Sequence, residues 1–139
     1  MTSPEAVATA FATAVVEGRF DDLVKRYAMP LVVEFKGNHQ TVPAHDRLIK
    51  LAEVVRAELL EKGVVEGVTE VLRPAVVNGD VAFVRALSRY LDANGETVTA
   101  SRFGYVMRRE AEDWKIMIVS AEELSGPTAE GLVAALDAE

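Results

Sequence analysis

The residues with the best-placed chemistry for an acid–base catalyst are a glutamate and the two histidines in the first third of the chain. The sequence contains two histidines, His39 and His45, and no cysteine. Because the pKa of imidazole lies near neutrality, His39 is a candidate proton carrier, and Glu34 is a candidate general base. His45 precedes Asp46 at the expected start of a helix, where a solvated capping role is the plainer account. Acid–base chemistry would therefore depend on Glu34 and His39.

The same residues fall short of a metal site. Two histidines six positions apart, without a placed carboxylate, do not supply the ligands that zinc needs. The absence of cysteine excludes thiolate nucleophiles, disulfides and cysteine-bound zinc. The chain also contains no glycine-rich phosphate loop, nucleophile elbow or paired-acid motif. We therefore expect neither a metal nor a cofactor.

Candidate ligand-binding residues lie in the second half of the chain. Arg85 stands in an otherwise apolar run, and its planar guanidinium could hold a carboxylate or phenolate of a ligand. Internal pairing with Glu34 or Glu70 is the alternative, because an unpaired buried charge is costly. Tyr105 could donate a hydrogen bond to a ligand carbonyl, or it could pack in the core with its hydroxyl satisfied.

Helical patterns dominate the N-terminal half. Ser3-Pro4-Glu5 is a helix-opening signal, and the apolar spacing predicts a helix over residues 4–17 that ends at Gly18. A short second helix is expected from residue 21 or 22 through Tyr27, ending before a proline. Strands are expected at 31–35 and 39–42, and a long helix at 43–62.

Strand patterns dominate the rest of the chain. From about residue 68 to residue 120, four β-rich runs are separated by turn signals at residues 78–79, 93–95 and 110–113. Turns this short join antiparallel neighbours, so the runs predict a meander. Helices followed by a meander indicate an α+β fold with the helices on one face of the sheet.

The central turn fixes which side chains share a face. A type I turn with Gly95 in the left-handed position places Asp92 opposite Glu96, so that Arg85 faces Phe103. A turn centred on residues 94 and 95 alone would shift the pairing by one residue, placing Arg102 and Gly104 on the face of Arg85. We prefer the first register. Its face, together with two aromatic residues that either line a cavity or fill the core, gives the candidate ligand-binding set: Phe83, Arg85, Ser101, Phe103, Tyr105, Tyr27 and Trp114.

The order of these elements resembles the nuclear transport factor 2-like superfamily, which includes SnoaL-like proteins and ketosteroid isomerases. The resemblance covers residues 4–124 and is most specific at residues 79–95 and at Trp114-Lys115-Ile116 followed by Ser120. Residues 79–95 are also similar to the association domain of calmodulin-dependent kinase. The resemblance implies a cystatin-like cone, with a curved antiparallel sheet wrapped around the N-terminal helices and one long helix to enclose a cavity.

The isomerase site itself is incomplete. The resemblance implies a carboxylate base on the first strand, where Glu34 stands one place from the closest alignment and Phe35 occupies the aligned position. The first helix offers Phe11 instead of a tyrosine. The expected pocket face has no aspartic acid, so two of the three roles in that mechanism are missing.

Composition bounds the class of protein. The 139 residues are 50% hydrophobic and 27% charged, which predicts a single domain of residues 1–139 with a core at about 4–124. Residues 125–139 are expected to form a C-terminal helix or a tail. The net charge of −7 disfavours nucleic acid and anionic membranes as partners. A first segment without a basic region, and apolar runs too short to span a bilayer, predict a cytoplasmic protein.

Three functions remain open. The first is small-molecule binding in an apolar pocket, with Arg85 orienting the ligand, and we favour it. The second is a SnoaL-like isomerase, cyclase or hydrolase with Glu34 or His39 as the base and Tyr105 as a hydrogen-bond donor. The third is a dimeric assembly module without a ligand. We expect a homodimer through the outer sheet face, formed by Val84, Ala86, Ser88 and Tyr90.

Overall fold

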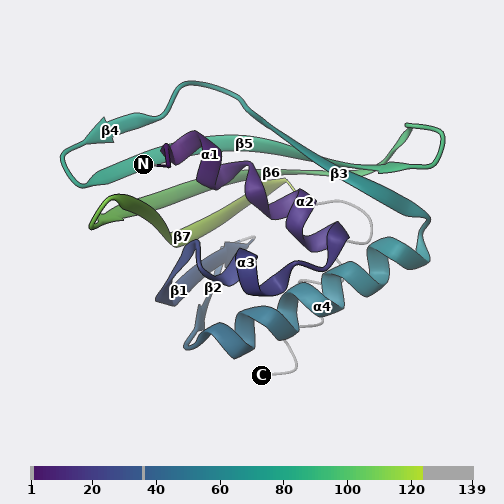
Figure 1. Ribbon diagram of the computed structural model, residues 1–139, viewed down its shortest axis with the longest axis horizontal. Helices are drawn as coiled ribbons and strands as arrows, with labels where there is room; N and C mark the ends of the chain where they lie inside the picture. Colours follow the sequence, from purple (N-terminus) through teal and green to yellow (C-terminus); the bar gives the residue numbers. More distant parts are fainter. Residues whose placement is uncertain (1, 36, 124–139) are drawn as a thin grey trace.

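The computed structural model of the chain describes residues 2–35 and 37–123. The expected C-terminal helix or tail at 125–139 lies outside these residues. Three short helices come first in Figure 1: α1 (Pro4–Ala8), α2 (Ala10–Glu17) and α3 (Phe20–Val24). The remaining elements are β1 (Tyr27–Phe35), β2 (Asn38–Val42), α4 (His45–Glu61), β3 (Val64–Val71), β4 (Val76–Asn78), β5 (Val81–Asp92), β6 (Thr97–Glu110) and β7 (Asp113–Glu123).

The first helical segment begins and ends as expected but is divided in two. The Ser3 hydroxyl caps α1 by accepting a hydrogen bond from the Ala6 amide at 3.1 Å. Gly18 ends α2 with a left-handed φ of 73°. Between them, the Thr9 hydroxyl donates to the Ala6 carbonyl at 3.0 Å, and α1 stops at Ala8. One expected helix is therefore two short ones.

Tyr27 corrects the second expected helix. α3 ends at Val24, and Tyr27 is the first residue of β1, where it pairs with Ile116 of β7. The Ile116 amide donates to the Arg26 carbonyl at 2.8 Å, which attaches this part of the chain to the sheet. Pairing with a strand distant in sequence overrode the local helical pattern.

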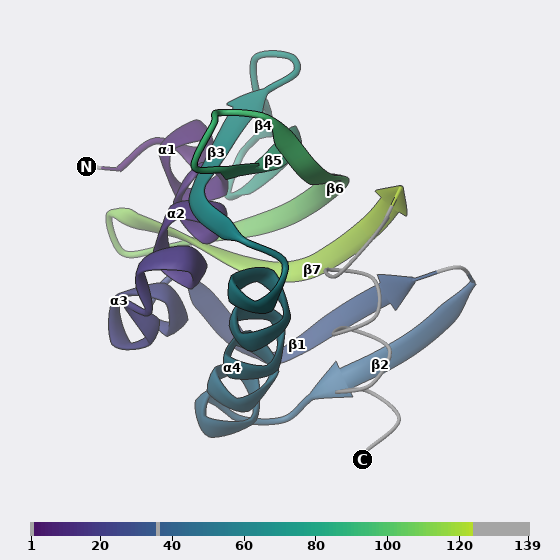
Figure 2. The ribbon, with the colours of Figure 1, turned by 90° about the vertical axis from the view of Figure 1, so that its right-hand side faces the viewer.

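All strands belong to one sheet, in the order β2-β1-β7-β6-β5-β3, with the short β4 paired to β5. The pairs β3–β5, β5–β6 and β6–β7 are antiparallel, which confirms the expected meander. β1 runs parallel to β7 and joins the N-terminal hairpin to this meander. The sheet is therefore mixed, and the expectation of a wholly antiparallel sheet is wrong in this one pairing. Figure 2 shows the sheet curving around the helices, as expected for a cystatin-like α+β fold.

The helices bury apolar stripes against the concave face of the sheet. α4 carries its buried side chains at helical spacing: Leu48, Ala52, Val55 and Leu59. α2 lies so close to β3 that the Thr13 hydroxyl donates to the Gly67 carbonyl at 3.1 Å. No helix in residues 2–35 and 37–123 is long and apolar enough to cross a membrane.

The turn between β5 and β6 forms as expected, but the register beyond it differs. The Asp92 amide donates to the Glu96 carbonyl at 2.9 Å, and Gly95 has a φ of 79°. Leu91 then pairs with Thr97, whereas Tyr90 pairs with Thr99, so a bulge inserts one residue into β6. Because side chains alternate along a strand, this insertion moves the rest of β6 to the opposite face relative to β5.

Phe83 and Arg85 consequently lie on the outer face of the sheet. Arg85 pairs with Gly104 and is exposed, and the Phe83 side chain is 49% exposed. The expectation that they share a face with Phe103 and Tyr105 is wrong.

The inner face of β5 contains the residues that we had expected outside. Each of them pairs with a buried residue of β6, and all of them belong to the core of the molecule. These former outer-face candidates are Val84, Ala86, Ser88 and Tyr90.

Candidate functional site

A small cavity lies between the concave sheet and two helices. Its volume is about 50 Å³, and α2, α4, β1, β6 and β7 all contribute to it. The lining side chains are Phe11, Tyr27, Leu31, Val33, Leu48, Leu51, Val55, Phe103, Tyr105, Val119 and Ala121. The cavity is therefore almost wholly apolar, apart from two phenols.

Aromatic rings form a row along one side of the cavity. The ring centroids of Phe11 and Phe103 are 6.3 Å apart, and those of Phe103 and Tyr105 are 5.9 Å apart. Both distances fall in the range of favourable aromatic pairs. Phe11 is only partly buried, so it forms the end of the row nearest to the surface.

All three tyrosines of the sequence are buried near one another in the core. Tyr27, Tyr90 and Tyr105 are 4%, 0% and 2% exposed. Burial raises the pKa of each phenol well above 10, and the charges that Tyr27 and Tyr90 would carry raise the pKa of Tyr105 further. The two phenols at the cavity are therefore protonated at neutral pH, and each carries an O–H group from which a ligand oxygen could accept a hydrogen bond.

The structure brings together three of the seven predicted ligand-binding residues. Tyr27, Phe103 and Tyr105 line the cavity. Ser101 is buried on the inner face, but it does not line the cavity, and its hydroxyl has no partner among the described residues. Trp114 is 5% exposed and lines a different hollow.

The apolar lining from the helices was not predicted. Leu48, Leu51 and Val55 belong to the apolar spacing that predicts the long helix at 43–62, and Phe11 belongs to the expected first helix. The sequence signal for these residues is the same as that of a filled core, because helical spacing identifies a buried face and not the space left beside it.

Glu34 and His39 lie together, but away from the cavity. The Nδ1 atom of His39 is 3.2 Å from Oε1 of Glu34, and their side chains are 68% and 42% exposed respectively. Leu31 and Val33 face the cavity from β1, and alternation directs Glu34 to the other side. The two candidates for acid–base chemistry form a surface pair on the β1–β2 hairpin.

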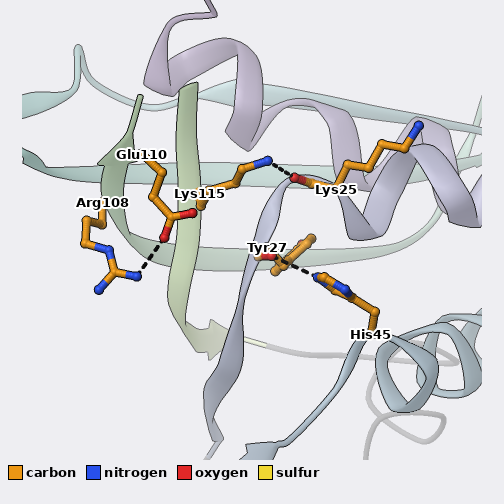
Figure 3. A network of polar contacts seen from close by, with 6 residues as sticks. All are labelled: Lys25, Tyr27, His45, Arg108, Glu110 and Lys115. Atoms are coloured by element: carbon orange, nitrogen blue, oxygen red, sulfur yellow. Dashed lines mark hydrogen bonds and ion pairs between the residues drawn. The ribbon is translucent and has the colours of Figure 1, made fainter. Parts of the chain in front are cut away.

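His45 has a different environment from the one expected. It is the first residue of α4, and its Nε2 atom lies 3.2 Å from the backbone carbonyl of Tyr27, a contact drawn in Figure 3. It thus connects the start of α4 to the start of β1. Within residues 2–35 and 37–123, no three histidine, aspartate or glutamate side chains gather as a metal site would require.

Solved structures place this fold in the NTF2-like, cystatin-like class. A structure of a variant of Rv3472, a protein of unknown function from Mycobacterium tuberculosis, matches with a TM-score of 0.69 and 15% identity, covering 96% of this chain and 86% of that chain. A domain of unknown function from Nostoc punctiforme matches with a TM-score of 0.68 and 16% identity, covering 97% and 83%. A ketosteroid isomerase-like protein from Erwinia carotovora atroseptica matches with a TM-score of 0.59 and 21% identity, covering 86% and 93%.

These identities are low, so the similarity concerns the fold alone. The family model described as NTF2-like protein (DUF6841) matches residues 5–124. The chain therefore belongs to this NTF2-like family, which confirms the resemblance seen in the sequence. No curated protein is significantly similar to it.

Proposed function

We propose that the protein binds a small, mostly apolar molecule in the cavity between α2, α4 and the sheet. The observation that carries this proposal is the lining: nine apolar side chains and two tyrosines. Burial keeps both phenols protonated, so Tyr27 and Tyr105 would donate hydrogen bonds to a carbonyl or ether oxygen of the ligand. They take the orienting role that we had expected for Arg85.

The size of the cavity limits the ligand. Pockets for drug-sized molecules usually measure about 300–1,000 Å³, whereas this cavity measures about 50 Å³. A ligand of one ring must therefore displace a side chain. Phe11 and Leu51 are the partly buried lining residues on the helices, and their movement away from the sheet would enlarge the cavity with little change in the backbone.

The lining favours binding over catalysis. Isomerase, cyclase or hydrolase chemistry needs an acid or base beside the substrate, and the described lining contains no histidine, aspartate, glutamate, lysine or arginine. Glu34 and His39 would have to act from the surface of the hairpin. We therefore retain the binding function and place the enzyme second.

The test compares two molecules of similar shape, acetophenone and ethylbenzene, of which only the first has an oxygen acceptor. Binding is followed by the NMR shifts of the Leu31, Leu48 and Val55 methyl groups. The wild-type protein should bind acetophenone more tightly than ethylbenzene, and Tyr105→Phe should remove most of this preference. Tyr90→Phe is the matched control, because Tyr90 is buried but does not line the cavity.

The possible results separate clearly. Equal affinity for both molecules would show that the phenols do not donate hydrogen bonds to the ligand. A preference for acetophenone that survives in the double variant Tyr27→Phe/Tyr105→Phe would show the same. Failure of both molecules to shift the three methyl groups would refute binding in this cavity. A preference lost in the Tyr105 variant and kept in the Tyr90 variant would support it.

We also propose that two copies associate through the outer face of the sheet. Leu72, Val76 and Phe83 are 39%, 64% and 49% exposed. Val76 pairs with Phe83, and the Leu72 amide donates to the Arg85 carbonyl, so these pairings place the three apolar residues close together, next to the exposed Arg85. Phe83→Glu should shift the sedimentation of a dimer toward the monomer, whereas Leu60→Glu, a change on exposed α4 surface, should not. Monomeric wild-type protein at high concentration would contradict this association.

A further inference from the structure

A second hollow, larger than the cavity, opens between the N-terminal helices and the start of β7. Its volume is about 380 Å³, within the range of small-molecule sites. α1, α2 and α3 form one wall, and Trp114 and Lys115 of β7 form part of the other. It shares no lining residue with the cavity described above.

The charge of this hollow is opposite to that of the whole chain. The sequence has a net charge of −7, with 15 basic residues. Six charged side chains line the hollow, and the basic ones exceed the acidic ones: Arg19, Lys25, Arg26 and Lys115 against Asp22 and Asp113. A local excess of positive charge in a hollow attracts anions.

Two of these cations have unused hydrogen-bond donors. Arg26 is partly buried, and its guanidinium has no hydrogen-bond or ion-pair partner among the described residues. A guanidinium has five donors, arranged to match two oxygens of a carboxylate or phosphate. Lys115 donates through its ammonium to the Lys25 carbonyl, and two more donors remain on that nitrogen.

The other two basic residues are placed less favourably. Figure 3 shows the Lys25 side chain pointing away from its own carbonyl and from the Lys115 ammonium. Arg19 is paired with Glu17 at 2.8 Å, and both side chains are about half exposed. Arg26 and Lys115 are therefore the pair that would hold a ligand, and Lys25 and Arg19 would add to the field.

The sheet topology explains why Arg26 and Lys115 are neighbours. β1 and β7 are parallel, so both strands begin at the same end of the sheet. The Ile116 amide donates to the Arg26 carbonyl at 2.8 Å, which aligns the residues just before the paired region. Trp114 precedes Lys115 and contributes buried aromatic surface to the same hollow.

We propose that this hollow binds a small organic oxyanion, a carboxylate or a phosphate monoester attached to an apolar group. Arg26 and Lys115 hold the charged oxygens through charge-assisted hydrogen bonds. The apolar group lies against Trp114 and Leu23, which line the same hollow. This site is separate from the cavity of the proposed function and does not depend on it.

Trp114 supplies the measurement, because it is the single tryptophan of the sequence and lines the hollow. Its fluorescence is titrated with cyclohexyl phosphate, cyclohexanecarboxylate and cyclohexanol, which share one ring and differ in the charged group. We expect saturable changes with at least one of the two anions and none with the alcohol. The tighter anion identifies the group that the site prefers.

Variants attribute the binding to the proposed residues. Arg26→Gln and Lys115→Gln should each lower the affinity for the anion about tenfold or more, which is the usual effect of losing a charge-assisted hydrogen bond. Asp22→Asn should raise the affinity for the anion, because it removes a negative charge from the lining. Lys50→Gln removes an exposed cation on α4 and should leave the affinity unchanged.

Three results would overturn the proposal. They are a fluorescence response to cyclohexanol equal to that of the anions, no response to either anion, and an affinity unchanged by Arg26→Gln. Because Arg26 is partly buried, circular dichroism must show that its variant is folded. If the Arg26 variant is unfolded, Asp22→Asn decides the outcome. Asp22 is exposed, and its substitution must raise the affinity for the anion for the proposal to stand.

Discussion

Tyr90 combines a buried ring that stabilises the fold with a buried hydroxyl that destabilises it. Its side chain is fully buried, and its hydroxyl has no hydrogen-bond partner among the described residues. Leaving a buried polar atom unpaired costs about 1–3 kcal/mol. The ring is nevertheless among the largest fully buried side chains, so its packing and its hydroxyl have opposite effects on stability.

We therefore expect Tyr90→Phe to raise the free energy of unfolding by about 1 kcal/mol. The ring and its contacts remain, and only the unpaired hydroxyl is removed. Urea denaturation followed by circular dichroism measures the change. Tyr90→Leu is the control and should destabilise the protein, because it leaves unfilled space in the core. A loss of stability in Tyr90→Phe would mean that the hydroxyl has a partner in solution, such as a buried water.

At the scale of elements, the contact between α2 and β3 depends on the absence of a side chain. A Cβ atom added at Gly67 would lie 2.5 Å from the backbone carbonyl oxygen of Ala12, far inside normal contact distance. The Thr13 hydroxyl also donates to the Gly67 carbonyl, which adds a hydrogen bond between α2 and β3 at this contact. The glycine thus sets the spacing between this helix and the sheet.

Gly67→Ala should lower the free energy of unfolding by about 1–3 kcal/mol, because the extra methyl group overpacks the contact. The same urea denaturation measures this loss. Glu66→Ala, at the exposed neighbouring position, should change stability by less than about 0.5 kcal/mol. Equal effects from the two substitutions would show that α2 is free to shift away from β3.

Elements were more predictable from the sequence than the faces they present. The turn at Asp92 followed its local chemistry: the Asp92 carboxylate accepts hydrogen bonds from the Asn94 and Glu96 amides at 2.9 and 3.0 Å. The bulge that follows has no comparable signal in the sequence, yet it moved Arg85 out of the predicted site. A local pattern can fix a turn, but one inserted residue beyond it reverses every face.

At the scale of the whole molecule, the three buried phenols link proton binding to folding. The pKa of each is raised in the folded state, mainly by burial, above the value of 10 that a tyrosine has in the unfolded chain. The folded protein therefore holds these protons more tightly than the unfolded chain does. The associated stability is fully present below pH 10 and is lost as the pH rises above it.

We expect the protein to unfold cooperatively in alkali as its tyrosines ionise. The tyrosinate absorbance and the loss of circular dichroism should follow the same transition, because the phenols cannot ionise in the folded core. A pH titration that records both signals checks this. Tyrosinate appearing while the circular dichroism is still native would show that at least one phenol is reachable by hydroxide in the folded protein.

The fold was predictable as a whole, whereas the candidate site was predictable only in part. Apolar periodicity and turns identified the α+β class and the meander, and three of the predicted residues, Tyr27, Phe103 and Tyr105, line the cavity. The proximity of Arg26 and Lys115 was not predictable, because it arises from a parallel pairing between strands far apart in the chain. Neighbours of this kind follow from topology, and no local pattern encodes them.

The parallel pairing of β1 with β7 also orders the events of protein synthesis. β1 leaves the ribosome early, whereas β7 is the last of the described strands to follow, and β2 is the only other strand with which β1 pairs. Until β7 emerges, the hairpin of β1 and β2 has no strand of the meander with which to pair, and the apolar faces of α2 and α4 are incompletely covered. The nascent chain therefore exposes apolar surface of the hairpin and the helices until β7 is available to pair with β1.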